Sequence, residues 1–144
     1  MARRMYEGTV LADCLVDLAE TGNPQAGPGY LPDPLPDPIP EVRAGRGGIV
    51  VRTRCPDFGK VQLEVWAGDP GARPPGWEIV FDGQLETQGN GFDAGTGGGL
   101  VFHVNAARGR YRLRAEARRD SAGRIDGVRF LFPEAGDLKG TALP

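Results

Sequence analysis

Residues 109–118 read GRYRLRAEAR, with an apolar side chain at every second position. The apolar set is Tyr111, Leu113, Ala115 and Ala117, and the positions around them hold Arg110, Arg112, Arg114, Glu116 and Arg118. Because successive side chains of a β-strand point to opposite faces, this stretch predicts a strand with one buried face and one charged face.

Similar alternation recurs along the chain, between turns rich in Gly, Pro and Asp. It covers residues 10–18, 49–55, 61–65, 77–81, 100–104 and 128–132, with an extension from Leu85 toward Thr87. Residues 10–18 could also form a short helix, but their apolar positions lack helical spacing. The turn at 56–59 (PDFG) predicts that 49–55 and 61–65 form a hairpin.

These segments predict an all-β fold, an antiparallel β-sandwich of about seven to eight strands with an extended Pro-rich N-terminal arm. Its core is expected to consist of the alternating apolar residues. The length of 144 residues fits a single domain, 1–144. Within it we expect a first strand in 1–21, the arm in 22–46, the sandwich body in 47–133 and a tail in 134–144.

The arm contains the run GNPQAGPGYLPDPLPDPIP at residues 22–40. Proline lacks an amide donor and forces the preceding residue toward extended conformations, so the run predicts an extended segment and not a helix. Leu31 and Leu35 recur within it. The arm is interpreted as a strap across the body, and the alternative is that Leu31 and Leu35 are offered to a partner protein.

The chain carries a formal net charge of −2. This balance argues against nucleic acid or an anionic membrane as a partner. No stretch has the length and apolarity of a signal-peptide core or a transmembrane helix. The sequence therefore predicts a cytoplasmic protein, or one in a particle assembled inside the cell, in which Cys14 and Cys55 are reduced.

Five short motifs in order suggest a family. They are EGTVLAD at 7–13, VQLEV at 61–65, GWEIVFD at 76–82, GRYRLRA at 109–115 and DGVRFLFP at 126–133. In this order they resemble the bacterial competence-protein-J-like group, small β-sandwich proteins whose namesake inhibits a nuclease of DNA uptake. The resemblance implies a β-sandwich that acts by binding another protein.

The residues predict no catalytic, cofactor-binding or metal-binding site, and therefore not an enzyme. His103 is the only histidine, and it is interpreted as an ordinary strand residue because a catalytic histidine normally needs a nucleophile or an acid partner, which here only the tertiary structure could supply. One histidine and two distant cysteines lack the spacing of a zinc site.

Three further motifs are interpreted as structural. They are the calcium-like loop Asp120, Ser121, Gly123 and Asp126, the glycine-rich stretch 95–99, and the carboxylate pairs Asp13 with Asp17 and Glu78 with Asp82. The first departs from EF-hand spacing and is expected to be a turn. The second lacks the GKS or GKT of a phosphate loop. The carboxylates of each pair are too far apart along a strand to act together as acid and base.

The charged face of the 109–118 strand is the candidate partner-binding site. It is a row of Arg110, Arg112, Arg114 and Arg118, which Arg52, Arg54 and Arg129 from other strands would extend. Guanidinium groups bind carboxylates through two parallel hydrogen bonds, so an acidic protein surface is the predicted partner. The alternative is that Glu64, Glu78 and Glu116 pair with these arginines across strands.

Trp66 is out of phase with the apolar residues of 61–65 and should point away from the core. It is a candidate interface anchor, or it is covered by the arm.

Two functions follow. The first is a non-catalytic protein-binding module of regulatory, inhibitory or immunity type, which uses the arginine face or the loops at one end. The alternative is a structural or decoration component of a phage or other large assembly, in which the arm reaches a neighbouring subunit, a homo-oligomer included.

Overall fold

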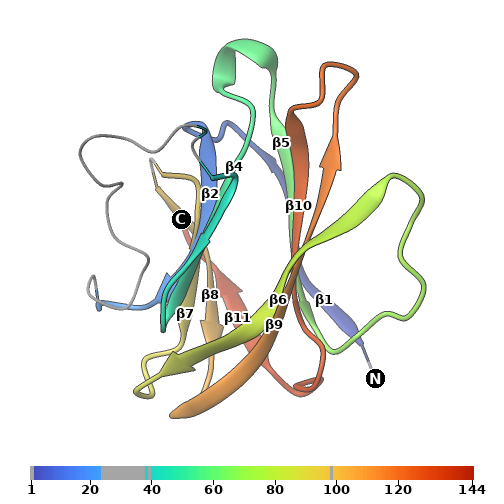
Figure 1. Ribbon diagram of the computed structural model, residues 1–144. Coiled ribbons are helices and arrows are strands. Elements are labelled where there is room, and N and C mark those ends of the chain that lie inside the picture. The colour runs from blue at the N-terminus through green and yellow to red at the C-terminus, as the bar shows by residue number, and fades with distance from the viewer. Residues whose placement is uncertain (1, 24–37, 39, 98) are drawn as a thin grey trace.

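The computed structural model describes residues 2–23, 38, 40–97 and 99–144. Within these ranges the chain forms eleven β-strands and one short 3₁₀ turn, η1 (Pro56–Phe58). The strands make two sheets that pack face to face (Figure 1). The predicted β-sandwich is confirmed, with more strands than the about seven to eight expected. None of the described segments is a helix long and apolar enough to cross a bilayer.

The first sheet has the strand order β1-β5-β10-β9-β6. Its strands are β1 (Arg3–Val10), β5 (Val61–Ala67), β10 (Ile125–Phe132), β9 (Gly109–Arg119) and β6 (Trp77–Thr87). Neighbours are antiparallel except β5 and β10, which run parallel. Parallel neighbours need a long connection, and here the chain makes four other strands between them.

The second sheet has the order β11-β8-β7-β2-β4-β3, with all neighbours antiparallel. Its strands are β11 (Lys139–Ala142), β8 (Leu100–Asn105), β7 (Phe92–Gly95), β2 (Leu15–Glu20), β4 (Gly48–Arg52) and β3 (Val42–Ala44). The segment expected to be a tail supplies the edge strand β11. The other edge strand, β3, falls within the expected arm.

The core lies between the two sheets, where the strands turn their apolar faces toward each other. Its largest fully buried side chains include Phe92, Phe130, Phe132, Leu18, Ile49, Leu63, Leu85 and Leu113. Burying one such side chain contributes about 1.5–3 kcal/mol. On β9 the buried apolar positions are Leu113, Ala115 and Ala117, as the alternation predicts.

The stretch 10–18, expected to be one strand, is divided between the two sheets. β1 ends at Val10 and β2 begins at Leu15. Between them, Cys14 has a φ of 65°, which is left-handed and incompatible with a continuous strand. Ala12 is buried at this corner, so the alternation of apolar residues continues through the turn. The sequence pattern therefore does not indicate where β1 ends and β2 begins.

The predicted hairpin of 49–55 and 61–65 is wrong. β4 belongs to the second sheet and β5 to the first. After β4, the amide of Thr53 donates to the carbonyl of Cys14 at 3.0 Å, and that of Arg54 donates to Ile125 at 2.9 Å. The chain therefore crosses from one sheet to the other, with η1 at the end of the sandwich.

A β-bulge in β6 changes which of its side chains face the core. The register against β9 shifts between Ile79 and Phe81. Before the bulge, Trp77 and Ile79 share the outer face with Arg118 and Glu116, and after it Phe81 and Leu85 share the inner face. The expectation that Trp77 and Ile79 belong to the core is wrong, because an inserted residue inverts the alternation.

Cys14 and Cys55 form a disulfide, with their Cα atoms 4.1 Å apart. The expectation of two reduced thiols, which came from the inferred compartment and not from geometry, is wrong for this structure. The bond joins the β1–β2 turn to the residue before η1. Disulfides are typical of oxidising environments, and the cytoplasmic location stays a prediction.

Leu31 and Leu35 lie outside the described residues. The interpretation of the arm as a strap, and the hypothesis that it reaches a neighbouring subunit, therefore stay predictions.

Candidate functional site

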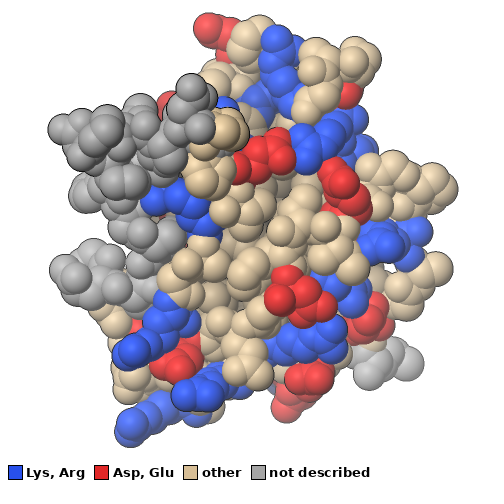
Figure 2. All heavy atoms as spheres, viewed as in Figure 1, with Lys and Arg blue, Asp and Glu red and all other residues tan. Residues whose placement is uncertain are grey.

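Arg110, Arg112 and Arg114 lie on the outer face of the first sheet, as the alternation of β9 predicts. Their register partners on β6 are Glu86, Gln84 and Asp82. The Nε atom of Arg110 lies 2.9 Å from a carboxylate oxygen of Glu86. In the view of Figure 2, Lys and Arg side chains are interspersed with Asp and Glu. The predicted row is present, but it has acidic neighbours.

Two arginines of the row are held by paired hydrogen bonds. Arg112 donates to both oxygens of Asp82 at 3.0 and 2.9 Å, and Arg114 donates to both oxygens of Asp69 at 3.1 Å. These hydrogen bonds hold the pKa of the Asp82 and Asp69 carboxyl groups below the usual value. A carboxylate from a partner would first have to displace an existing one.

Arg129, expected to extend the row, is buried at the centre of this outer face. The exposed fractions are 4% for Arg129, 6% for Glu64 and 1% for Glu116. Nη1 of Arg129 donates to Glu116 at 2.8 Å, and its Nε lies 3.4 Å from Glu64. The guanidinium also lies 5.3 and 5.5 Å from the ring centres of Trp66 and Trp77. Cross-strand pairing of arginine with glutamate is confirmed here.

Trp66 points away from the core, as predicted. Its neighbours in the register are Leu131 and Arg4, and its indole nitrogen donates to Glu64 at 2.8 Å. The Arg4 guanidinium lies 5.9 Å from the ring centre. The indole ring is half-buried by these contacts, and its predicted cover by the arm lies outside the described residues.

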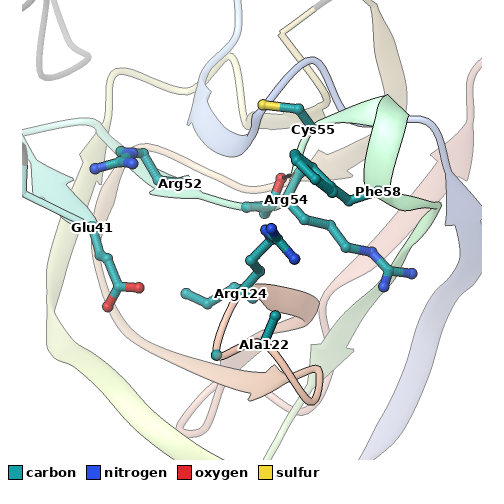
Figure 3. Close-up of a pocket in the computed structure, with 10 residues that line it drawn as sticks. Glu41, Arg52, Arg54, Cys55, Phe58, Ala122 and Arg124 are labelled. Carbon is teal, nitrogen blue, oxygen red and sulfur yellow. Dashed lines mark hydrogen bonds between the residues drawn. The ribbon is translucent and has the colours of Figure 1, made fainter.

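Arg52 and Arg54 do not join the row. They lie where β4 leaves the second sheet, and both line a cavity of about 360 Å³ at this end of the sandwich (Figure 3). Arg54 donates from Nε to the backbone carbonyl of Lys60 at 3.0 Å, and its Nη1 lies 3.4 Å from Asp120. Its charged end therefore turns away from the cavity, whereas Arg52 lies beside Glu41 on one side of it.

The other side of the cavity is formed by Phe58 of η1 and Arg124 of the β9–β10 turn (Figure 3). The Arg124 guanidinium lies 3.8 Å from the centre of the Phe58 ring, a cation–π contact. The Asp120 carboxylate accepts hydrogen bonds from the amides of Ala122 and Arg124 at 2.9 and 3.0 Å. These bonds close the turn that carries Arg124.

Exposed apolar side chains lie at the same end, on its connections or at the start of a strand. The exposed fractions are 59% for Leu11 in the β1–β2 turn, 52% for Phe58 and 54% for Leu100 at the start of β8. The amide of Asp13 donates to the carbonyl of Thr96 at 2.9 Å, which joins the β1–β2 turn to the β7–β8 connection. The disulfide joins the same turn to η1, so three connections form one surface, called here the loop end.

His103 has acidic and hydroxyl neighbours, but at a single ring nitrogen. Its Nδ1 lies 2.7 Å from Asp93 and 3.2 Å from the hydroxyl of Thr21. A catalytic histidine contacts its acid and its nucleophile through opposite nitrogens. The cluster therefore does not place a general base beside a nucleophile.

The motifs interpreted as structural have internal partners. Asp120 closes a turn and Asp126 pairs with Arg118 at 2.9 Å, so the predicted turn is confirmed. In the glycine-rich stretch, the amide of Thr96 donates to the carbonyl of Gly99 at 2.9 Å.

Of the two carboxylate pairs, Glu78 and Asp82 form ion pairs with arginines, whereas Asp13 and Asp17 do not share one environment. Glu78 pairs with Arg119 at 2.8 Å, and Asp82 with Arg112. Asp13 lies exposed in a turn, whereas burial raises the pKa of Asp17 on β2. No three His, Cys, Asp or Glu side chains in the described ranges are grouped as a metal site would require.

Sequence reasoning missed Arg124, Phe58, Leu11 and Leu100. A signal was present for Phe58, because it is a large apolar residue inside a turn, where burial is not expected. For the others the sequence held no comparable signal, since their proximity depends on which connections share an end.

The fold and this site define a β-sandwich with a charge-paired outer face and an arginine-lined cavity among its end loops. No family profile matches the chain, and no curated protein matches it in sequence. Its structure is similar to the crystal structure of ComJ from Bacillus subtilis, described as an inhibitor of the DNA degrading activity of NucA. The TM-score is 0.63 over 91% of this chain and 96% of ComJ, at 9% sequence identity. At that identity the likeness shows the fold. The fold implied by the sequence resemblance is thus confirmed, and family membership stays a prediction.

Proposed function

We propose that this chain is a non-catalytic protein-binding module that inhibits or regulates the protein it binds. The observation that carries the proposal is the loop end, where Leu11, Phe58 and Leu100 are each more than half exposed and Phe58 also lines the arginine-lined cavity. Several large apolar side chains left exposed at one end of a domain are costly in water, and such an end is commonly a surface that another protein covers.

The fold likeness to ComJ supports an inhibitory role, because that protein is an inhibitor by its description. A DNA-degrading nuclease is accordingly the first class of target to test. The single-sided arrangement at His103 supports a non-catalytic role. The row Arg110, Arg112 and Arg114 is a second candidate surface, but its arginines already hold carboxylates.

The experiment is affinity capture from the native organism with the tagged chain, followed by activity assays on each captured protein with and without the purified chain. For each captured protein, DNA-degrading activity is assayed first. The test variant is Leu11→Ser/Phe58→Ser/Leu100→Ser. The matched control is Ile79→Ser, which removes the fourth exposed large apolar side chain, on the outer face of β6. A third arm is Arg110→Ala/Arg112→Ala/Arg114→Ala.

We expect wild type and Ile79→Ser to capture the same enzyme and to lower its activity in a saturable manner, and the loop-end variant to do neither. Loss of capture only in the triple arginine variant would move the binding surface to the outer face of β9. Capture of enzymes whose activity the chain leaves unchanged would contradict an inhibitory role.

A further inference from the structure

The cavity at the loop end holds a guanidinium that is fixed in place and that has no carboxylate at ion-pair distance among the described residues, although its charge helps to lower the pKa of Asp120. Arg124 stacks on Phe58, and no ion pair joins it to another residue of the described ranges. By contrast, Arg112, Arg114, Arg118, Arg119 and Arg129 each hold at least one carboxylate. Within the part of the chain that the structure describes, Arg124 thus differs from these five arginines in that its guanidinium donates no hydrogen bond to a carboxylate.

Both walls that position Arg124 are anchored. Its turn is closed by the Asp120 carboxylate and by a hydrogen bond from the amide of Asp120 to the carbonyl of Arg124 at 2.8 Å. Phe58 sits on η1, which follows Cys55, and the disulfide ties Cys55 to the β1–β2 turn. A pre-positioned donor loses less entropy when it binds, so this geometry favours a ligand.

The rest of the cavity indicates the charge that fits. Arg52 adds a second cation at its edge (Figure 3). Glu41 is the acidic residue of the lining, and both of its oxygens accept hydrogen bonds from Arg119, at 2.6 and 2.8 Å. Those bonds hold the pKa of Glu41 below its usual value, so Glu41 stays ionised, and Arg119, which also pairs with Glu78, offsets part of its charge. The cavity therefore offers net positive charge.

We infer that this cavity receives one acidic side chain, an Asp or Glu, of the protein partner, bound by Arg124 with Arg52 beside it. The inference rests on the proposed protein-binding function and names its central contact. Guanidinium and carboxylate match through two parallel hydrogen bonds. Exposed Leu11, Phe58 and Leu100 at the same end indicate that apolar residues flank the acid. The phosphates of a nucleic acid would lie beside these apolar side chains and the Glu41 carboxylate, which is unfavourable. A protein partner therefore fits this end better than a nucleic acid.

The test uses the full chain labelled with ¹⁵N and a small probe, the peptide acetyl-Leu-Asp-Leu-amide. Its matched control is acetyl-Leu-Asn-Leu-amide, which lacks only the charge. We expect the acidic peptide to shift the Nε–H resonance of Arg124 and the amide resonance of Gly123 in a saturable manner, and the control peptide not to. A short single-stranded DNA oligonucleotide is titrated in parallel.

The test variant is Arg124→Gln, and Arg108→Gln removes the same charge from the β8–β9 turn at the opposite end of the sandwich. We expect Arg124→Gln to weaken peptide binding about tenfold or more, and Arg108→Gln to leave it unchanged. Thermal unfolding of both variants checks that they fold. Equal shifts with both peptides, or unchanged binding by folded Arg124→Gln, would overturn the inference. Tighter binding of the oligonucleotide at Arg124 would overturn it as well.

The two proposals can fail separately. If affinity capture recovers an inhibited enzyme equally well with Arg124→Gln and with wild type, the carboxylate subsite is wrong while the function stands. If the acidic peptide binds at Arg124 but no enzyme is captured and inhibited, the proposed function is wrong while the subsite stands.

Discussion

Arg129 joins the charged and aromatic groups at the centre of the first sheet's outer face. Replacing it with methionine keeps much of the side-chain volume but leaves the buried Glu64 without its arginine and the buried Glu116 with Arg114 as its remaining cation, at 3.0 Å. Removing one partner of a buried ion pair costs about 3–5 kcal/mol. We expect Arg129→Met to lower the free energy of unfolding, measured by urea denaturation, by that amount.

The control is Arg129→Met/Glu64→Gln/Glu116→Leu, in which no buried charge is left unpaired. It should recover most of the lost stability, because an apolar cluster of similar volume avoids the cost of desolvating charges. If Arg129→Met alone were as stable as wild type, the ion pairs would contribute nothing to the fold.

Tyr111 and Arg112 are adjacent on β9 and test the assignment of its two faces. The Tyr111 ring packs edge-on against Phe92 and Phe132, and its hydroxyl donates to the carbonyl of Ala107 at 2.7 Å. We expect Tyr111→Ala to lower the free energy of unfolding by about 3 kcal/mol. Arg112→Ala should change it little, because the pair with Asp82 is exposed to solvent. Equal effects in urea denaturation would mean that the faces are assigned wrongly.

At this scale alternation predicted the faces of β9 and the outward direction of Trp66 correctly. It could not predict the bulge between Ile79 and Phe81. An inserted residue does not interrupt the alternation of apolar and polar residues in the sequence. It reverses which of them face the core, because the direction of a side chain follows the hydrogen-bonded register with the neighbouring strand.

Among the elements, the β1–β2 turn and η1 depend on the disulfide that joins them. Cys14 and Cys55 are 41 residues apart in the sequence, so the bond limits the freedom of a long loop in the unfolded chain. We expect Cys14→Ser/Cys55→Ser to lower the free energy of unfolding by about 2–4 kcal/mol, measured in urea.

Wild type in the presence of a reducing agent should match this variant, and the variant itself should not respond to the agent. A thiol titration of denatured, unreduced wild type should find no free thiol. Two free thiols in that titration would show that the bond does not form in the purified protein.

For the whole molecule, the arginine–carboxylate pairs predict how stability depends on pH. Hydrogen bonds from Arg119, Arg114 and Arg112 lower the pKa of Glu41, Asp69 and Asp82, whose usual values are 4.5, 3.8 and 3.8. A carboxyl group whose pKa is lower in the folded state stabilises the fold above its usual pKa. That contribution is lost as the pH falls through the lowered value.

Burial raises the pKa of Asp17, which works in the opposite direction. The pKa values of Glu20 and Asp120 are lowered as well, so five lowered carboxyl groups against one raised group predict that the urea midpoint falls as the pH drops below about 4.5. Asp69→Asn/Asp82→Asn should make this decline shallower, whereas Asp57→Asn, an exposed carboxylate on η1, should not. If the urea midpoint of wild type and of both variants declined identically with falling pH, groups other than Asp69 and Asp82 would be responsible for the acid sensitivity.

Short-range order along the chain determined the fold class. Alternating apolar and charged residues between Gly, Pro and Asp turns can bury their apolar side only in a sandwich or barrel of strands, and the alternation within 109–118 is enough to place Arg112 and Tyr111 on opposite faces. The loop end was decided by the tertiary structure alone. Leu11, Phe58 and Arg124 lie on three separate connections and Leu100 begins β8, and all four come to the same end of the sandwich because β4 and β5 enter different sheets and the disulfide closes the corner. Periodicity describes how each strand faces its neighbours, whereas the meeting of connections depends on strand order, which no local pattern encodes.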